Sequence, residues 1–433
     1  MNYKKSLLWV ILIMAIISTT FSEKDINIYY LGNGLKLLVK QNPYNDIVAI
    51  DCFIDVGSYY ETVENNGITN FVQKMLLKGT KKRSAFEISN ALEEVGGIIN
   101  INTAEDYAEV YTITTSANID IAITILSDIL FNPTFPKEEV EKERNIILSE
   151  IKRNEDNSFQ HCYKLFKKTL YGNSSYALPV EGDTKVIKQI SRDDLIEYYK
   201  MYYVPNNMII TIVGNVNPSD IVTKIDEAFG YYEESQVQRP IPEIKTSSER
   251  KEVVVEKDVM QAMIIVGYPT VSIDNDDYAR LKVLNAILGT GMSSRLFVAL
   301  RDRKGLAYAV GSFSATRRAS SHLAGYIGTK PESLEEAKIG LIEEINRLKR
   351  ELVTEEELEK AKKSIIGRYL IDHQENKRQA YYLGWYELIG VGQNFDDLYI
   401  QKIKNVTRFD VNRVANIYLD SPTIAIIKPK EKK

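Results

Sequence analysis

The two halves of this sequence resemble each other, and an internal duplication leaves few architectures open to the chain. In both halves, segments rich in Val, Ile, Thr and Tyr alternate with long amphipathic stretches of helical period. The segment 48–58 (VAIDCFIDVGS) predicts a strand, and 261–270 (QAMIIVGYPT) predicts its equivalent in the second half. Segments 135–153 and 354–372 predict equivalent charged helices. We therefore expect an α+β fold of two homologous domains, each a sheet covered by helices.

The domain boundaries follow from a change in composition near the middle of the chain. With 433 residues, the chain is longer than one hydrophobic core usually organises. Residues 233–252 (EESQVQRPIPEIKTSSERKE) are polar, contain two prolines and show no periodicity, which is typical of an interdomain linker. We predict an N-terminal domain at 23–232 and a C-terminal domain at 253–433, facing each other across a cleft.

The first 22 residues have the pattern of a secretory signal peptide. Lys4 and Lys5 precede the apolar run 7–17 (LLWVILIMAII), and small residues follow in STTFS. The run is short for a membrane span, and we expect cleavage after Ser22, giving a signal peptide at 1–22. A retained signal anchor is the alternative. The mature protein is expected to be exported, to a periplasm.

The composition argues against one broad class of partner. A formal net charge of -4 leaves no basic excess to neutralise phosphates, so no nucleic acid is expected to bind. No membrane association is expected beyond the export signal. The chain has two cysteines, Cys52 and Cys162, which could pair in an oxidising compartment. Two unrelated buried thiols is the interpretation we favour.

A helix with an unusual polar face is predicted over 67–80 (GITNFVQKMLLKGT). Asn70, Gln73 and Lys74 are three and four residues apart, so they project from one side of this helix. The apolar residues of the stretch would pack inward. The polar trio therefore needs its own explanation.

The stretch 67–80 resembles the zinc-site helix of the insulinase-like, or pitrilysin-type, metallopeptidases, whose motif reads H-x-x-E-H. The resemblance covers nearly all of the mature chain in order. It continues through EEVGGIININ (93–102), FNPTF (131–135), ERNIILSEI (143–151), YALPVEGDTKVI (176–187), YYVPNNMIITIVGNV (202–216) and LGTGMSSRLFVALRDRKGLAYAV (288–310). It implies the family's fold, with an antiparallel-rich sheet in each domain.

The resemblance also shows which residues have taken the place of the metal ligands. In that family two histidines and a distal glutamate bind zinc, and the glutamate between the histidines transfers a proton. The histidine positions here are Asn70 and Lys74, and the glutamate position is Gln73. The distal ligand position matches Glu150, and an accompanying acidic position matches Glu143. A carboxamide is a poor zinc ligand and an ammonium repels a dication, so we expect no metal in this chain.

The two glutamates suggest what has replaced the metal. Glu143 and Glu150 are seven residues apart, which places them on one helical face. If the fold is that of the family, both would point towards Lys74, whose ammonium would supply the positive charge in place of zinc. The alternative is that Lys74 reaches solvent and the glutamates are hydrated.

Two further positions of the family's pattern are retained. Arg301 and Tyr308, in LRDRKGLAYAV (300–310), match residues that the family uses to grip the substrate and stabilise the oxyanion. The alternative is a surface Arg and a core Tyr before a strand. Asn100, with its neighbour Ile101, matches an edge strand near the bound peptide, where an extended peptide can add as a further strand.

The expected function is that of a peptidase homologue that is inactive alone. The resemblance implies a non-catalytic subunit of a heterodimer, in which Arg301 and Tyr308 complete the active site of a zinc-bearing sibling chain that hydrolyses unfolded peptides. No cofactor is expected in this chain, and Zn²⁺ is expected in the partner. A peptide-binding or scaffold protein without an enzymatic partner is the main alternative. A residual hydrolase with an unforeseen metal site is the third.

Overall fold

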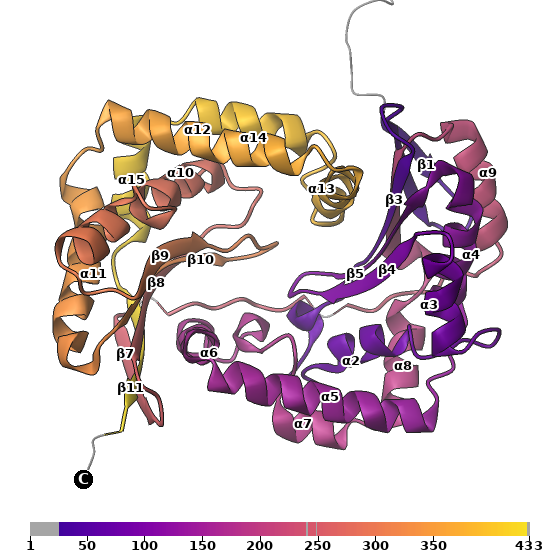
Figure 1. Ribbon diagram of the computed structural model, residues 1–433, viewed down its shortest axis with the longest axis horizontal. Helices are drawn as coiled ribbons and strands as arrows, with labels where there is room; N and C mark the ends of the chain where they lie inside the picture. Colours follow the sequence, from indigo (N-terminus) through magenta and orange to yellow (C-terminus); the bar gives the residue numbers. More distant parts are fainter. Residues whose placement is uncertain (1–25, 240, 248, 431–433) are drawn as a thin grey trace, which may run out of the picture.

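The computed structural model describes residues 26–239, 241–247 and 249–430. The signal peptide predicted at 1–22 lies outside the described residues. Two separate β-sheets, each covered by helices, form the two ends of an elongated molecule (Figure 1). The expected α+β class, with two sheets covered by helices, is therefore confirmed.

The strands of the two sheets come from the two halves of the chain. The first sheet has the order β1-β2-β6-β3-β5-β4, and the second has the order β7-β11-β8-β10-β9. The strands of the first sheet are β1 (Ile26–Tyr30), β2 (Lys36–Gln41), β3 (Ile47–Ile54), β4 (Ile98–Thr103), β5 (Ala108–Thr115) and β6 (Met208–Gly214). Those of the second are β7 (Lys251–Lys257), β8 (Ala262–Thr270), β9 (Ala309–Ser314), β10 (Ser321–Thr329) and β11 (Thr423–Pro429).

The strand order bears out the internal duplication. Apart from β1, the strands of both sheets follow one another in space in the same chain order: first, fifth, second, fourth, third. One pair in each sheet is parallel, β2 with β6 and β7 with β11. The other neighbouring strands are antiparallel, as the prediction of antiparallel-rich sheets requires. β3 and β8 occupy equivalent places, as predicted.

Helices cover both sheets and include the two long ones predicted. The segments 135–153 and 354–372 correspond to α5 and α12. The helices of the first half are α2 (Ile68–Met75), α3 (Ala85–Glu93), α4 (Ile119–Phe131), α5 (Lys137–Asp156), α6 (Ser158–Tyr171), α7 (Thr184–Gln189), α8 (Arg192–Tyr202) and α9 (Pro218–Phe229). Those of the second are α10 (Tyr278–Gly289), α11 (Leu334–Arg350), α12 (Glu355–Asp372), α13 (Asn376–Leu388), α14 (Phe395–Lys404) and α15 (Arg408–Tyr418).

One face of each sheet packs against helices of its own half. α4 and α9 pack on the first sheet, where Val39, Ile50 and Ile212 belong to a large apolar core. α10, α11 and α15 pack on the second sheet, where Ile264 and Val266 belong to the corresponding core. Each half therefore has its own hydrophobic core, as expected for two domains.

The other face of each sheet is covered by a helix from the opposite half. α6, from the first half, packs on β8 and β11, and α13, from the second half, packs on β3 and β6 (Figure 1). Glycines allow the close approach in both places. A Cβ on Gly267 would lie 2.4 Å from Cζ of Phe166, and a Cβ on Gly384 would lie 2.6 Å from Cδ2 of Phe53. The two halves are thus joined by an exchange of helices.

Polar contacts fix α13 against the first sheet. The ammonium of Lys377 lies 2.5 Å from Oε1 of Glu109 and 3.4 Å from Oδ2 of Asp51. Thr211 Oγ1 donates a hydrogen bond to the carbonyl oxygen of Ala380 at 2.9 Å. Asp51 is fully buried, and burial followed by the charge of Glu109 raises its pKa. α13 therefore brings a counter-charge to acidic residues of the other half.

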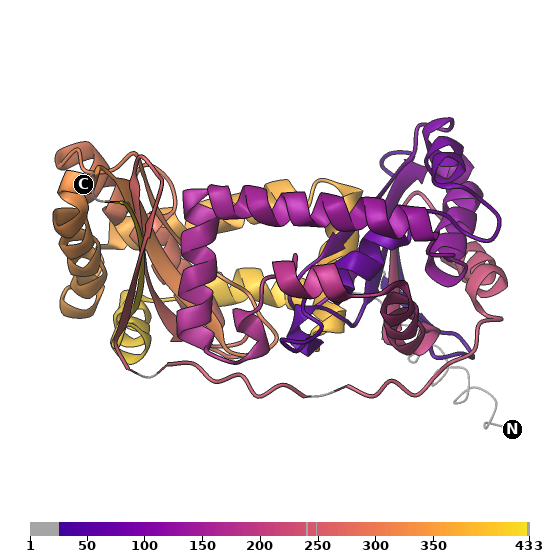
Figure 2. The same ribbon diagram turned by 90° about the horizontal axis from the view of Figure 1, so that it is seen from below.

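The segment between the two sheets has no regular secondary structure. From Glu233 to Arg250 the described residues follow an extended path along one side of the molecule (Figure 2). The predicted linker, 233–252, overlaps the first two residues of β7. The domains predicted at 23–232 and 253–433 stay a prediction, because each of these ranges contributes a helix to the sheet of the other.

The two cysteines are both buried free thiols, as the favoured interpretation expected. Burial raises the pKa of Cys162 to about 12, and it raises the pKa of Cys52 as well. Both thiols are therefore protonated and unreactive at neutral pH. Among the described residues, no helix combines the length and the apolar character needed to cross a membrane.

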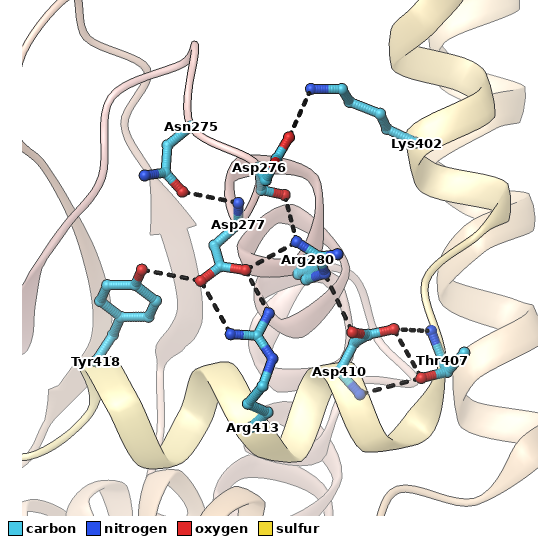
Figure 3. Close-up of polar contacts among 9 residues, drawn as sticks. All are labelled: Asn275, Asp276, Asp277, Arg280, Lys402, Thr407, Asp410, Arg413 and Tyr418. Carbon is cyan, nitrogen blue, oxygen red and sulfur yellow. Dashed lines mark hydrogen bonds and ion pairs between the residues drawn. The ribbon is translucent and has the colours of Figure 1, made fainter.

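A cluster of charged side chains ties α15 to α10 (Figure 3). The carboxylate of Asp277, directly before α10, accepts hydrogen bonds from Arg280 at 2.9 Å, Arg413 at 3.2 Å and Tyr418 at 3.0 Å. Arg280 also donates to Asp410, in the first turn of α15, at 3.1 Å. Burial alone would raise the pKa of Asp277, but the hydrogen bonds from Arg413 and Tyr418 outweigh burial and lower the pKa.

Replacing Asp277 with Asn is expected to lower the free energy of unfolding by about 1–3 kcal/mol, because two guanidinium groups lose a charged acceptor. Urea denaturation measures the change. Asp276→Asn is the matched control, since that side chain is 89% exposed and forms only a long ion pair, at 3.5 Å, with Lys402 among the described residues. The control should stay within about 0.5 kcal/mol of the unmodified protein. Equal effects of the two substitutions would contradict the role of Asp277.

Candidate functional site

The site predicted from the sequence is built around the short helix α2. Ile68, Phe71, Val72 and Met75 are buried and hold this helix against the first domain. The buried carboxylate of Glu61 accepts hydrogen bonds from the backbone N–H groups of Gly67 and Thr69, at 2.7 and 3.0 Å. These bonds satisfy free N–H groups at the N-terminus of the helix. Gly67 has φ +93°, and a Cβ there would lie 2.5 Å from Cα of Gly182.

Lys74 forms the predicted ion pairs with both glutamates of α5. Its ammonium lies 3.0 and 2.9 Å from the two carboxylate oxygens of Glu150, and 3.4 Å from Oε1 of Glu143. The side chain of Glu143 is only 4% exposed, and that of Lys74 is 20% exposed. The prediction that Lys74 forms ion pairs with these carboxylates is confirmed. The alternative, in which Lys74 extends into solvent, is wrong.

A second lysine, which the sequence analysis missed, completes this cluster. The ammonium of Lys78 lies 2.8 Å from Oε2 of Glu143. Lys78 lies three residues beyond α2, which ends at Met75, earlier than the helix predicted over 67–80. Its position four residues after Lys74 is the signal that would have identified it. The buried carboxylate of Glu143 is thus shared by two ammonium groups. We call Lys74, Lys78, Glu143 and Glu150 the lysine–glutamate cluster.

Gln73 is fully buried and connects α2 to the first sheet. Its amide nitrogen donates hydrogen bonds to the carbonyl oxygens of Glu109, at 3.0 Å, and Asn102, at 3.3 Å. Its amide oxygen is buried and has no hydrogen-bond partner within the part of the chain that the structure describes. Asn70, one turn earlier than Lys74, is half-buried. The three polar residues thus occupy one face of α2, as predicted.

This set of side chains does not fit a zinc ion. Zinc in proteins is bound by thiolates, imidazoles and carboxylates, and the two carboxylates present here are both engaged by ammonium groups. Gln73 and Asn70 offer only carboxamides. Within the described ranges, no three side chains of His, Cys, Asp or Glu lie together in a way that could hold a metal ion.

Asn100 and Ile101 lie on an edge strand beside α2. β4 is the last strand of the first sheet, and α2 packs against it. Asn100 is exposed and pairs in register with Tyr111, while Ile101 is half-buried and pairs with Val110. Because β5 pairs with one side of β4 only, the other side offers backbone groups to an added strand. The edge strand and the lysine–glutamate cluster therefore belong to one region of the first domain.

Arg301 and Tyr308 lie in the second half of the chain. Arg301 is exposed in a π-helical segment, η5 (Phe297–Arg303), and its guanidinium is 5.2 Å from the ring centre of Phe297. Tyr308 is 50% exposed, and its backbone N–H donates to the carbonyl oxygen of Gly328 at 2.9 Å. It precedes β9, the edge strand of the second sheet. The structure therefore places this pair directly before β9, in a different half of the chain from the residues of α2.

Ion pairs that the sequence analysis did not identify hold the two halves together. Arg317 donates to Oε1 of Glu105 at 2.6 Å, and Lys167 reaches the same oxygen at 3.4 Å. Arg318 donates to Asp55 at 2.7 Å. Burial alone would raise the pKa of Glu105, but Arg317 and Lys167 lower it to about 2. The partners of the two arginines are more than 200 residues away in the sequence, so these pairs leave no local pattern in a single sequence.

Both halves of the chain match models of one peptidase family. Residues 36–184 match the model described as "Insulinase (Peptidase family M16)", and residues 189–365 match "Peptidase M16 inactive domain". An uncharacterized zinc protease of Bacillus subtilis is 30% identical over 403 residues, which cover 93% of this chain and 98% of that protein. An uncharacterized zinc protease of Rickettsia felis is 31% identical over 412 residues, covering 94% and 99%.

Solved structures share the architecture. A protease from Helicobacter pylori superposes with a TM-score of 0.87 at 24% identity, covering 94% of this chain and all of that one. A peptidase M16 inactive domain from Pseudomonas fluorescens superposes with a TM-score of 0.86 at 20% identity, covering 94% and 99%. At these identities the likeness establishes the fold alone.

Proposed function

The chain belongs to the insulinase family, M16, of peptidases, and on this premise we propose that it is the metal-free, substrate-gripping subunit of a zinc peptidase. The observation that carries the proposal is the lysine–glutamate cluster. At the positions where the family's motif has metal ligands, an ammonium lies 2.9 Å from the carboxylate of Glu150 and 3.4 Å from that of Glu143. A dication has no place between carboxylates that are already neutralised.

The proton-transfer chemistry is also missing from α2. A carboxylate accepts a proton from water and returns it to a leaving amine, whereas a carboxamide has no basic site of that kind. Gln73 in addition donates its amide hydrogens to two backbone carbonyl groups of the first sheet. Its side chain serves to join α2 to β4 and β5. These contacts support a structural role for this position and leave hydrolysis to another chain.

What this chain would contribute is a grip on the substrate and donors for the developing oxyanion. The exposed guanidinium of Arg301 and the half-exposed phenol of Tyr308 are hydrogen-bond donors that suit a negatively charged oxygen. An unfolded peptide would add to an edge strand, as at Asn100 and Ile101, through its own backbone groups. The zinc ion and the general base would belong to a sibling chain that carries an intact H-x-x-E-H motif.

The proposed setting is an exported heterodimer in a periplasm. The N-terminal sequence pattern supports export, and the slight negative charge argues against nucleic acid as a partner. The relatives in Bacillus and Rickettsia are named zinc proteases, which supports an association of this chain with zinc-dependent proteolysis. The substrate class is an unfolded peptide.

The purified chain is expected to retain no stoichiometric zinc after dialysis and to leave unfolded peptides intact. Addition of the zinc-bearing sibling, identified by co-purification from the native host, should produce cleavage that neither chain gives alone. Elemental analysis measures the zinc, and chromatography of the peptide measures cleavage. A sibling whose motif glutamate is replaced by glutamine serves as the control and should stay inactive in the mixture. Zinc-dependent cleavage by the isolated chain would contradict the proposal.

A peptide-binding protein without an enzymatic partner is the second candidate, and the exposed edge strand favours it. β4 pairs on one side only, so it can accept a peptide with no contribution from Arg301 or Tyr308. If the mixture of chains stays inactive while a labelled unfolded peptide binds the isolated chain, this second function is supported.

A further inference from the structure

A cavity lined by aromatic residues lies where the two halves of the chain meet. Its volume is about 420 Å³, which falls within the range of sites for small molecules. The loop between β4 and β5 forms one wall, and α10, α12, α13, α14 and the loop between β9 and β10 form the others. None of the residues assigned above to peptide hydrolysis lines it. Binding of a ligand in this cavity would therefore not depend on the proposed role in peptide hydrolysis.

The walls of this cavity present ring faces. Seven of the lining residues are tyrosines, and Trp385 is an eighth aromatic side chain. Several of the hydroxyl groups are already engaged: Tyr107 bonds to Tyr381 at 2.8 Å, and Tyr382 donates to Asp372 at 2.9 Å. What remains for a ligand is a set of apolar ring surfaces, which suits a planar or bulky apolar group.

One amine in the cavity lacks a counter-charge. The ammonium of Lys282, on α10, donates hydrogen bonds to the carbonyl oxygen of Ser314 at 2.7 Å and to Oγ1 of Thr316 at 2.9 Å. It lies 5.0 Å from the ring centre of Tyr278. Across the described ranges, no carboxylate lies within ion-pairing distance of it. An ammonium in such surroundings is costly unless an anion accompanies it.

The other charged groups of the lining are Arg317, Asp106 and Arg378, and each has its own partner: Arg378 lies 3.7 Å from Asp372. The guanidinium of Arg317 is paired with Glu105. Asp106 accepts hydrogen bonds from the hydroxyl of Tyr176 at 2.5 Å and from the backbone N–H of Arg318 at 3.1 Å. None of these groups neutralises Lys282, and Arg317 adds a second positive charge near it. The cavity therefore has a positive site among aromatic walls.

We propose that this cavity binds a small carboxylate that carries an aromatic or bulky apolar group. The carboxylate would accept a hydrogen bond from the ammonium of Lys282, and the apolar group would lie between the tyrosine rings. Two sources share this chemistry: a free aromatic acid and the C-terminal residue of a peptide. The walls come from both halves, so a bound ligand would contact both.

The position of Trp385 allows a direct binding test. The sequence has two tryptophans, Trp9 and Trp385, so the full-length Trp9→Phe chain carries a single one, in the wall of the cavity. We expect N-acetylphenylalanine to change the fluorescence of Trp385 in a saturable way. N-acetylphenylalaninamide, which lacks the carboxylate, should bind about 10- to 100-fold more weakly. Equal affinities, or no saturable change with the acid, would overturn the proposal.

Substitutions at Lys282 extend this test. Lys282→Met should reduce the affinity for the acid to that for the amide, while Lys360→Met, at an exposed position on α12, should leave it unchanged. If Lys282→Met does not fold, the comparison of acid and amide on the unmodified cavity still decides the matter. Acetyl-Gly-Gly-Phe separates the sources: binding at least as tight as that of the small acid indicates a peptide C-terminus, and exclusion indicates a free acid.

The pH dependence gives an independent readout. Burial, followed by the charge of Arg317, lowers the pKa of Lys282 to about 7. Because a carboxylate binds the protonated amine, affinity should fall about tenfold for each unit of pH above this value. The groups that line the cavity with Lys282 include Tyr278 on the same helix, and Arg317, Asp106, Arg378 and Tyr381 on neighbouring elements. Affinity that stays constant between about pH 6 and pH 9 would overturn the assignment of Lys282 as the anion-binding group.

Discussion

Replacing Glu105 with Gln is expected to lower the free energy of unfolding by about 3–5 kcal/mol. The carboxylate of Glu105 is 2.6 Å from Arg317 and 3.4 Å from Lys167, and the side chains of all three residues are at most 14% exposed. Without its charge, two buried cations from opposite halves of the chain would face each other unpaired. Urea denaturation of the two proteins measures the difference.

Glu93→Gln is the matched control for this experiment, because Glu93 is an exposed glutamate of the same half. It should change the free energy of unfolding by less than about 0.5 kcal/mol. If Glu105→Gln lowers the free energy of unfolding by less than about 1 kcal/mol, the contacts of Glu105 with Arg317 and Lys167 behave as surface ion pairs do.

The effect of Glu105 also has a defined pH dependence. The folded-state pKa, about 2, is below the ordinary value of 4.5, so the charged form is the one that the fold stabilises. The stabilisation is therefore complete above about pH 4.5 and is lost as the pH falls towards 2. The difference in the free energy of unfolding between the unmodified protein and Glu105→Gln should therefore decrease as the pH falls from about 4.5 to about 2.

Replacing Arg301 with Ala is expected to cost the reconstituted peptidase about 2–4 kcal/mol of transition-state stabilisation. A guanidinium that contacts the oxyanion only in the transition state lowers kcat and kcat/KM together and leaves KM nearly unchanged. Steady-state kinetics of the two-chain mixture measures both parameters. This outcome would support the proposed role of Arg301 in stabilising the oxyanion.

Arg303→Ala is the control for Arg301, because both arginines are exposed and belong to the same π-helical segment. It should leave the kinetics of the mixture unchanged. If Arg301→Ala also leaves kcat of the two-chain mixture unchanged, the proposed oxyanion role of Arg301 is wrong.

The architecture was open to prediction because its signals are local. The local richness of 48–58 and 261–270 in strand-forming residues predicted β3 and β8, and these strands occupy equivalent places in the two sheets. The spacing of Glu143 and Glu150, together with the family resemblance, predicted that both would meet Lys74, and they do. A helical face is set by spacing, so such contacts can be inferred before a structure is available.

The contacts between the halves were not predictable in the same way. The approach of Phe166 to Gly267, and of Phe53 to Gly384, depends on which helix covers which sheet, and no periodicity records that choice. The aromatic cavity likewise gathers α10, α12, α13, α14 and a loop of the first half. The tyrosines that line it look like ordinary packing residues when each is considered alone. Only the fold brings these rings together around Lys282, which creates an aromatic cavity with one amine in its wall.

The exchange of helices has a consequence for the order in which the protein is made. The strands of the first sheet are all synthesised once the ribosome has passed Gly214, but the helix that covers its second face begins at Asn376. At a typical synthesis rate of about 5–20 residues per second, that face, with Phe53 and the carboxylate of Asp51, stays uncovered for many seconds. A nascent first half is therefore exposed to aggregation during this interval, and a chaperone or a secretion machinery that keeps it unfolded would protect it.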